Sequence, residues 1–157
     1  MKLNEARSPW FGDAPLAYPA RIARGRDGRW LVRFPQLPEA LTDGASLAKA
    51  MGEARDCLNE SLMSRVVDGE DIPAPRAAQR GEKLVAPDAT VALKAAMHRV
   101  VRARGLTAAQ LARVLGVDHK EARRILNPRH PTKQRRLSEA LAALGYEVMV
   151  TVREKAA

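Results

Sequence analysis

Residues 18–44, YPARIARGRDGRWLVRFPQLPEALTDG, decide the fold of the first half of the chain. Tyr18–Arg24 alternates roughly between polar and apolar side chains, and residues 25–28 have the Gly and Asp content of a tight turn. Trp30–Phe34 combines aromatic and β-branched residues, which favour strands. Two such segments around a turn predict a β-hairpin.

Prolines limit the strands that follow this hairpin. Pro35 and Pro38 are expected to end the second strand, because proline has no N–H group to donate to a ladder. A short third strand is predicted over residues 39–41, and residues 42–44 are predicted to form a turn.

A long helix is predicted next, with Ser46 as its N-cap. Residues 72–75, IPAP, then force an extended connection, and residues 83–86 are predicted to add a fourth strand. The order β-β-β-α-β predicts a small sheet with one helix packed across it. The apolar residues of the helix recur every three or four positions, as on one helical face: Leu47, Met51, Ala54, Leu58, Leu62 and Val66.

The rest of the chain predicts an arm at one end and helices at the other. Residues 1–17 contain Pro and Gly without a clear period, and we expect a flexible arm. Asp88 is predicted to cap a helix that ends before Gly105, and Thr132 is predicted to open the last helix. Residues 146–152 alternate between apolar and polar side chains, which predicts a terminal strand. The predicted fold class is therefore α+β, with the β-β-β-α-β domain at residues 18–86 and an all-α domain with a terminal strand at residues 88–157.

Residues 107–127, TAAQLARVLGVDHKEARRILN, predict two short helices joined by a tight turn at residues 115–117. Thr107 and Gln110 have the spacing of a capping box, and Asp118 and Glu121 repeat that spacing. The stretch resembles the DNA-binding helix-turn-helix, whose second helix lies in the major groove.

The charge distribution supports a nucleic-acid partner for the second half. The formal net charge of the 157 residues is +9. Residues 1–87 hold 13 Lys and Arg against 12 Asp and Glu, whereas residues 88–157 hold 14 against 6. Concentrated positive charge suits a polyanion, because neutralised phosphates release counterions. An Arg-rich proteome also produces basic surfaces, so charge alone does not decide the function.

The predicted DNA contacts come from both short helices and the loop after them. On the second helix, Arg and Lys can donate to guanine O6 and N7. Beyond that helix, Arg and Lys are expected to contact phosphates, and Arg135 and Arg136 are expected to join them. The predicted DNA-binding residues are Thr107, Gln110, His119, Lys120, Arg123, Arg124, Arg129 and Lys133.

The sequence does not support several other classes of protein. No apolar run approaches the ~18 residues of a membrane span, so no membrane partner is expected. The N-terminus lacks the apolar core of a secretory signal, which makes the cytoplasm the expected compartment. Cys57, the one cysteine, excludes an internal disulfide and a Cys-rich zinc site.

No catalytic, cofactor-binding or metal-binding residue is predicted. His98, His119 and His130 show no metal-ligand spacing, and no Gly-rich phosphate loop follows a predicted strand. Catalysis needs convergent groups, and the predicted elements bring none together.

The first half also resembles a known protein family. It begins with Tyr18-Pro19, turns at Asp27-Gly28, ends a strand with FPQLP at residues 34–38 and closes with IPAP at residues 72–75. Together with Thr42-Asp43-Gly44, this order and spacing resemble the HicB antitoxin family. The likeness covers about residues 18–76, and the second half is similar to the C-terminal region of many members.

The resemblance implies a fold, a role and partners. The fold is a partial RNase H-like domain without the nuclease carboxylates. The role is that of an antitoxin, not an enzyme, which masks a HicA-like mRNA-cleaving toxin and represses its own operon. The implied partners are that ribonuclease toxin, operator double-stranded DNA and further copies of this chain. Residues 18–86 would bind the toxin, and residues 88–157 would bind DNA and dimerise.

Two other functions stay open at this point. The chain could be a stand-alone transcription regulator whose first domain senses a ligand or a protein. It could also be a degenerate nuclease that uses Asp27 and Asp43. Co-purification with a small toxin would favour the antitoxin over the regulator. Metal-dependent cleavage that disappears when both aspartates are changed would favour the nuclease.

Overall fold

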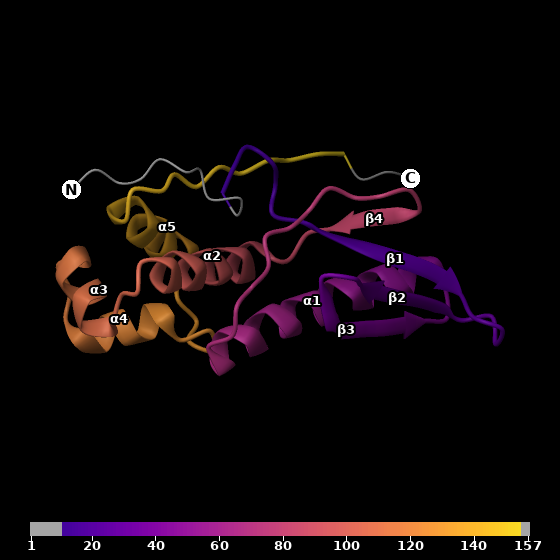
Figure 1. The fold of residues 1–157 in the computed structure, drawn as a ribbon, viewed down its shortest axis with the longest axis horizontal. Coiled ribbons are helices and arrows are strands. Elements are labelled where there is room, and N and C mark those ends of the chain that lie inside the picture. The colour runs from indigo at the N-terminus through magenta and orange to yellow at the C-terminus, as the bar shows by residue number, and fades with distance from the viewer. Residues whose placement is uncertain (1–10, 155–157) are drawn as a thin grey trace. The chain divides into compact units, whose positions relative to one another are not determined.

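The computed structural model describes residues 11–154, which form two compact units. Unit 1 comprises the described residues up to Leu62 together with Ile72–Asp88, and unit 2 comprises Met63–Asp71 together with residues from Ala89 onward. The division falls inside the first helix. The elements (Figure 1) are β1 (Tyr18–Arg24), β2 (Trp30–Phe34), β3 (Leu37–Gly44), α1 (Leu47–Asp68), β4 (Glu82–Val85), α2 (Ala89–Ala103), α3 (Ala108–Leu115), α4 (His119–Leu126) and α5 (Gln134–Ala143).

Unit 1 is built on an antiparallel sheet with the strand order β3-β2-β1-β4. The predicted hairpin forms with Ile22 opposite Val32, and the predicted fourth strand pairs with the start of β1, Tyr18 opposite Val85. Tyr18, Val32 and Phe34 are fully buried. The buried residues of α1 within unit 1 supply the other half of this core: Ala50, Ala54, Leu58, Ser61 and Leu62.

The third strand is longer than the sequence predicted. Pro38 lies inside β3, and residues 42–44, predicted as a turn, continue the ladder with Gly44 opposite Trp30. The second strand does end at Phe34 as predicted, but the third strand begins at Leu37 instead of residue 39, and the predicted turn at residues 42–44 is wrong. β3 is an edge strand of this sheet, and an edge strand tolerates a proline because only one side of its backbone must be paired.

A close approach joins the end of β3 to α1. A Cβ atom at Gly44 would lie 2.4 Å from the backbone nitrogen of Ala50, so a larger residue does not fit there. The predicted N-cap is confirmed, since the Lys49 N–H donates to Ser46 Oγ at 3.2 Å. Gly44 and Ser46 together determine where the chain leaves the sheet and begins α1.

Unit 2 is a cluster of helices in which α2 packs against α4 and α5, and α3 packs against α4 (Figure 1). Its core is aliphatic, as expected from a half that has only Tyr146 as an aromatic residue. The large buried side chains are Met97, Val100, Leu111, Ile125, Leu137 and Leu141. None of the described helices combines the length and the apolar character that a bilayer crossing requires.

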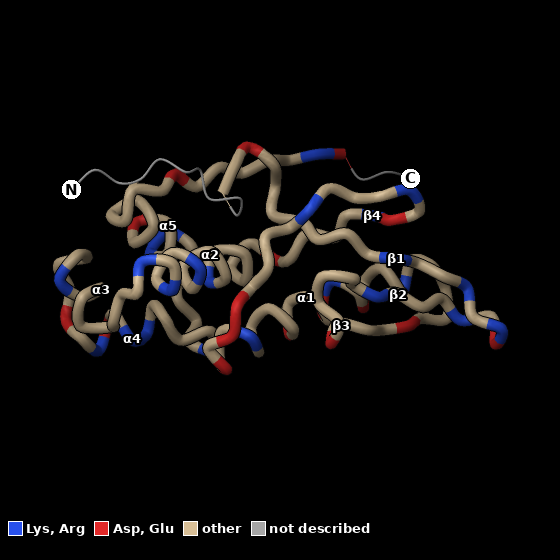
Figure 2. The backbone as a smooth tube through the Cα atoms, viewed as in Figure 1, with Lys and Arg blue, Asp and Glu red and all other residues tan. Residues whose placement is uncertain are grey.

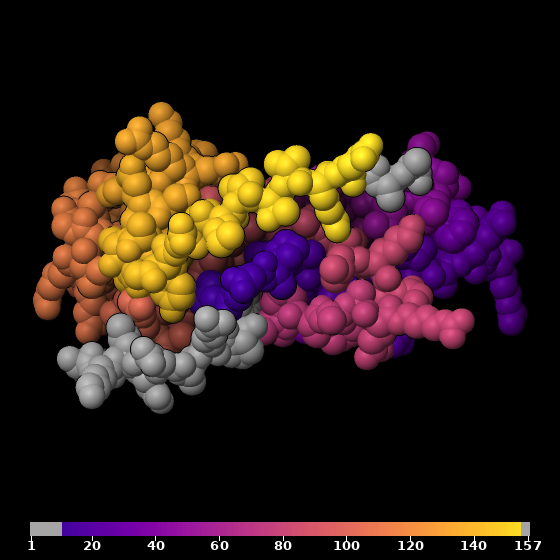
Figure 3. Space-filling model, turned by 90° about the horizontal axis from the view of Figure 1, so that it is seen from above, coloured from indigo at the N-terminus to yellow at the C-terminus, as the bar shows by residue number. Residues whose placement is uncertain are grey.

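The predictions for the two ends of the chain are tested by the structure to different extents. The predicted arm falls largely on residues 1–10, which lie outside the described residues. Residues 146–154 form an extended segment (yellow in Figure 3) that has no paired strand within the described chain. A strand needs a hydrogen-bonded neighbour, and the four strands of the sheet all belong to unit 1. Residues 146–154 therefore add no strand to the described elements. Those elements still combine a sheet with helices, so the predicted α+β class is confirmed.

Candidate nucleic-acid interface

The first short helix, α3, begins at the capping box that the sequence predicted. The Gln110 N–H donates to Thr107 Oγ1 at 3.2 Å, and the Thr107 N–H donates to Gln110 Oε1 at 2.8 Å. Two of the N–H groups that a helix leaves unpaired are thereby satisfied. Thr107 and Gln110, both predicted DNA contacts, therefore also act together as the cap.

The turn between α3 and α4 depends on a left-handed residue. Gly116 has φ of 64° and ψ of 35°, and its N–H donates to the carbonyls of Ala112 and Arg113. A side chain at this position would be strained, which explains the glycine. Leu111 and Ala112 of α3 and Ala122 and Ile125 of α4 are buried, so the two helices share a small core.

The second short helix, α4, begins at Asp118 as predicted, but only half of the predicted capping box forms. Asp118 Oδ1 accepts from the Glu121 N–H at 2.7 Å. The Glu121 side chain instead binds Arg136 of α5, with Arg136 Nε at 2.8 Å and Nη2 at 2.6 Å from Glu121 Oε1. An ion pair with a neighbouring helix has replaced the local bond to the N-cap, and Arg136 is part of this pair.

The exposed face of α4 carries the basic residues that the sequence singled out. His119, Lys120, Arg123 and Arg124 are all exposed. Within residues 11–154, none of the four takes part in an ion pair with a described carboxylate. Figure 2 shows Lys and Arg positions in blue along this part of the chain. Donors that are free of internal partners are available for an external acceptor.

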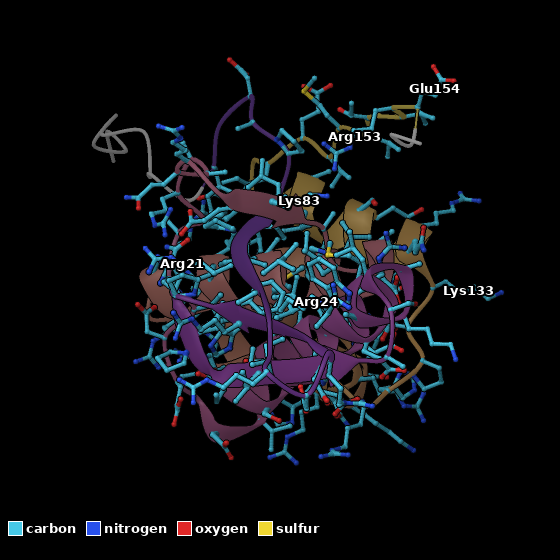
Figure 4. All side chains as sticks on the ribbon, turned by 90° about the vertical axis from the view of Figure 1, so that its right-hand side faces the viewer. Arg21, Arg24, Lys83, Lys133, Arg153 and Glu154 are labelled. Atoms are coloured by element: carbon cyan, nitrogen blue, oxygen red, sulfur yellow. The ribbon has the colours of Figure 1, made fainter. Side chains whose placement is uncertain are left out.

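The loop after α4 places the two remaining predicted residues. Arg129 is exposed, and its N–H donates to Asn127 Oδ1 at 2.9 Å, which holds the start of the loop. Lys133 is the N-cap residue of α5, with no side-chain capping bond, and its side chain projects away from the ribbon in Figure 4. Thr132, predicted to open α5, faces inward instead and hydrogen-bonds to Lys94.

Arg135 lies on α5 and differs from Lys133 in its surroundings. Arg135 Nε lies 2.9 Å from Glu139 Oε1, and this arginine lowers the pKa of Glu139 below its usual value. Arg135 and Arg136 were both expected to contact phosphates, and both are engaged within α5 or with α4. Lys133 and Arg129 are the better placed of the four for an external phosphate.

Sequence reasoning missed Lys94, which lies in the middle of α2. Its side chain is buried, and Nζ lies within hydrogen-bond distance of four oxygens, three of them backbone carbonyls at the end of α4 and in the loop after it. The available signal was its position among apolar residues of α2, since Ala95, Met97 and Val100 are buried with it. A lysine on a buried stripe indicates a specific set of acceptors.

The family-like residues of unit 1 are joined by long-range hydrogen bonds. Tyr18 Oη donates to the Pro73 carbonyl at 2.9 Å. Gln36 Nε2 donates to the Ala74 carbonyl at 2.7 Å, and Gln36 Oε1 accepts from the Arg76 N–H at 3.0 Å. These hydrogen bonds link the IPAP connection to the Tyr-Pro start and to the FPQLP strand end. We call this set of hydrogen bonds the connection clamp.

Glu82 completes the connection clamp from β4. Its side chain is 1% exposed, and Arg76 donates to both of its carboxylate oxygens at 2.7 and 2.9 Å. Arg21 Nε on β1 lies 3.1 Å from Glu82 Oε1, and Figure 4 labels Arg21 on β1 and the β4 residue Lys83. The paired Arg76 guanidinium and the Gln79 N–H hold the pKa of Glu82 at about 2.

Asp27 and Asp43, which the nuclease alternative would use, both bind Arg29. Asp27 Oδ1 accepts from the Arg29 N–H at 3.1 Å inside the turn, and Asp43 is paired with the Arg29 side chain. Within the described residues, no group of three His, Cys, Asp or Glu could hold a metal ion. The two aspartates have structural partners in the β1–β2–β3 region.

Known proteins resemble this chain over most of its length. The family model for HicB-like antitoxins of bacterial toxin–antitoxin systems matches residues 17–96. Antitoxin HicB 2 of Photorhabdus laumondii is 34% identical over 130 residues, which cover 83% of this chain and 91% of that protein. Antitoxin HicB of Escherichia coli K12 is 30% identical over 137 residues, 87% of this chain and 99% of that protein.

A further relative matches a similar share of the chain. Antitoxin HicB of Pseudomonas fluorescens is 28% identical over 142 residues, which cover 90% of this chain and 97% of that protein. The family model spans the connection clamp, and relatives that cover 83–90% of this chain necessarily include part of the β-β-β-α-β region and part of unit 2. The chain belongs to the HicB-like antitoxin family of bacterial toxin–antitoxin systems.

Proposed function

We propose that this antitoxin masks a small HicA-like ribonuclease toxin with residues 18–86 and represses its own operon with residues 88–157. Membership of the family makes the chain an antitoxin rather than an enzyme and implies a toxin partner. The observation that carries the repressor half is the exposed basic face of α4, with His119, Lys120, Arg123 and Arg124.

The geometry of α3 and α4 supports major-groove binding. α4 begins at a side-chain cap and is packed through Ala122 and Ile125, so its remaining face is turned outward. The N–H groups of a helix start and Arg or Lys side chains are suited to phosphates and to guanine edges, respectively. In this proposal Arg123 and Arg124 contact bases, while Arg129 and Lys133 contact phosphates.

The DNA half is tested with the full chain and the DNA upstream of its own operon. We expect a specific complex that forms in preference to an unrelated duplex of equal length at matched salt. Binding strength should fall steeply with salt, because Lys and Arg displace counterions from the phosphates. Equal affinity for both duplexes would refute sequence-specific repression.

The toxin half is tested by rescue from toxicity. A candidate HicA-like toxin is expressed with and without this chain, and growth and mRNA integrity are measured. We expect growth arrest and mRNA cleavage with the candidate toxin alone, and neither when the antitoxin is present. A stand-alone regulator with a sensing domain would leave the arrest unchanged.

Self-association is proposed to use the C-terminal segment. Met149, Val150 and Val152 are 74%, 85% and 91% exposed, and a groove beside residues 146–148 is lined by Ser138, Glu139 and Ala142 of α5. An unpaired extended segment with apolar residues favours pairing with the same segment of a second copy. Such a dimer would present two α4 helices to two half-sites.

Sedimentation measures this proposal directly. The full chain should sediment as a dimer or larger at micromolar concentration, whereas a chain that ends at Gly145 should sediment as a smaller species. If both sediment identically, residues 146–157 do not hold the copies together.

A further inference from the structure

Lys94 is the buried cation of the described part of unit 2, with 3% of its surface exposed. Its Nζ lies 3.2 Å from the Arg124 carbonyl, 3.0 Å from the Ile125 carbonyl and 2.7 Å from the Asn127 carbonyl. Thr132 Oγ1 lies 2.9 Å away. The four acceptors belong to the last turn of α4 and to the loop that follows it.

These contacts satisfy groups that a helix end leaves unpaired. The last four carbonyls of a helix have no intrahelical N–H donor, and α4 covers only the Arg123 carbonyl with a cap, through the Asn127 N–H. A cation at a helix C-terminus also interacts favourably with the helix dipole. Burial lowers the pKa of Lys94 to about 8, which leaves its ammonium charged at neutral pH.

Apolar packing alone specifies the orientation of α4 weakly. The helix has eight residues, and the buried ones are the small Ala122 and a single larger side chain, Ile125. Two polar attachments act at its opposite ends. Glu121 in the first turn is paired with Arg136 of α5, and Lys94 of α2 holds the last turn.

We propose that Lys94 is a positioning residue for operator recognition, which sets the angle of the last turn of α4 and thereby aims Arg123, Arg124 and the Arg129 loop at the DNA. This role rests on the proposed DNA binding. Lys94 itself is buried and contacts no phosphate, so it acts only through the backbone that it binds.

The loop after α4 depends on the same attachment. Thr132 Oγ1 accepts from Lys94 and also lies 3.3 Å from the Arg124 carbonyl and 3.1 Å from His130 Nδ1. The loop is therefore fastened at its far end to the residue whose side chain is proposed to contact a base. Movement of Lys94 would displace Arg124 and the loop together.

The first test compares DNA binding by Lys94→Met and Lys49→Met in the full chain. Both variants exchange a lysine for a side chain of similar length, and Lys49 is an exposed residue of α1. Lys94→Met is expected to lose about tenfold in affinity for the operator, the size of one guanine contact, with a much smaller loss on an unrelated duplex, because only phosphate contacts of the displaced loop are weakened there. Its salt slope should fall by no more than about 0.9, the value for one phosphate, because Lys94 itself contacts no phosphate and Arg129 is the phosphate contact nearest to it. Lys49→Met should bind like the parent.

A merely structural role gives a different pattern. Unit 2 would then melt at a lower temperature, and both affinities would fall in parallel. That outcome, or an unchanged operator affinity in Lys94→Met, overturns the proposal. If Lys94→Met does not fold, Thr132→Val removes one of the four acceptors and should show the same selective loss, smaller in size. An unchanged operator preference in Thr132→Val would overturn the proposal as well.

A second readout separates this inference from the proposed function, because it uses no DNA. Amide hydrogen exchange is measured for the free parent and variant chains. Lys94→Met should accelerate exchange at Asn127, His130 and Thr132, whose N–H groups bond within the last turn and the loop, and should leave the α3 amides unchanged. Unaltered exchange at these three amides refutes the positioning role, whether or not the parent binds its operator.

Discussion

The side-chain hydrogen bonds that hold unit 1 together join residues far apart in the sequence, whereas those that cap α3 and α4 join residues close together in the sequence. The connection clamp joins Tyr18 to Pro73 and Gln36 to Ala74, residues 55 and 38 positions apart. The caps of α3 and α4 join Thr107 to Gln110 and Asp118 to Glu121, three positions apart. Unit 1 therefore forms as a whole, whereas each short helix carries its own start signal. Changes in unit 1 should act on stability, and changes on α4 should act on binding.

The largest expected effect is on DNA binding. Arg123→Ala with Arg124→Ala removes two proposed base contacts, each of which contributes roughly 1–3 kcal/mol of discrimination. We expect operator affinity to fall by about 100-fold, with a small loss on an unrelated duplex and with toxin neutralisation unchanged. Electrophoretic mobility shifts at matched salt measure the first two effects, and growth rescue measures the third.

Lys133→Ala is the matched control for that double variant. It should weaken operator and unrelated duplex alike and reduce the salt slope by about 0.9, the value for one phosphate. If the double arginine variant behaves as Lys133→Ala does, Arg123 and Arg124 supply charge without sequence information. Sequence-specific recognition by α4 would then be refuted.

The next effect is on the stability of unit 1. Gly44→Ala places a Cβ atom 2.4 Å from the Ala50 nitrogen, and relief of that overlap must move β3 away from α1. We expect unit 1 to lose about 2 kcal/mol in the free energy of unfolding, as overpacking usually costs. Trp30 lies on β2, so its fluorescence in a urea titration follows unit 1. Gly52→Ala, at an α1 glycine with open space around its Cβ, is the control and should be neutral or stabilising.

A smaller effect is expected when a local cap is removed. Thr107→Ala loses the side-chain acceptor for the Gln110 N–H and should cost about 1 kcal/mol. The change should appear in the helical circular dichroism transition and leave the tryptophan transition in place. A shift of both transitions by the same amount would show that the two units unfold together, against the contrast drawn here.

The last expected effect is a loss of the stability of unit 1 at acidic pH only. The folded pKa of Glu82 is about 2, against 4.5 for the free carboxyl, so its carboxylate stabilises unit 1 above about pH 4.5. That stabilisation is lost as the pH falls from about 4.5 through about 2. The urea midpoint of the tryptophan transition should therefore fall in this interval, and Glu82→Gln should show a flatter dependence. Identical pH profiles for parent and variant would show that the Glu82 carboxylate does not stabilise unit 1.

The same difference in sequence separation explains which features of the structure the sequence could predict. The hairpin, the Ser46 and Thr107 caps and the exposed face of α4 follow from residues close together in the chain, and each is present. The extent of β3 depended on its place at the edge of the sheet, which no local pattern reports. Lys94 and the Glu121–Arg136 pair depended on which helices meet. Their side chains were visible in the sequence, but their partners were 15 to 38 positions away.

The connection clamp has a consequence for the lifetime of the antitoxin. Residues 72–79 carry no helix or strand, and an extended segment of this kind is what a protease active site accepts. Tyr18, Gln36 and Glu82 hold this segment through Pro73, Ala74 and Arg76, so cleavage there requires unit 1 to open first. The cleavage rate then reports the population of the open form, and a bound toxin that stabilises unit 1 would slow proteolysis by mass action. With the proposed toxin bound to unit 1, the antitoxin is therefore expected to be degraded more slowly than the free antitoxin.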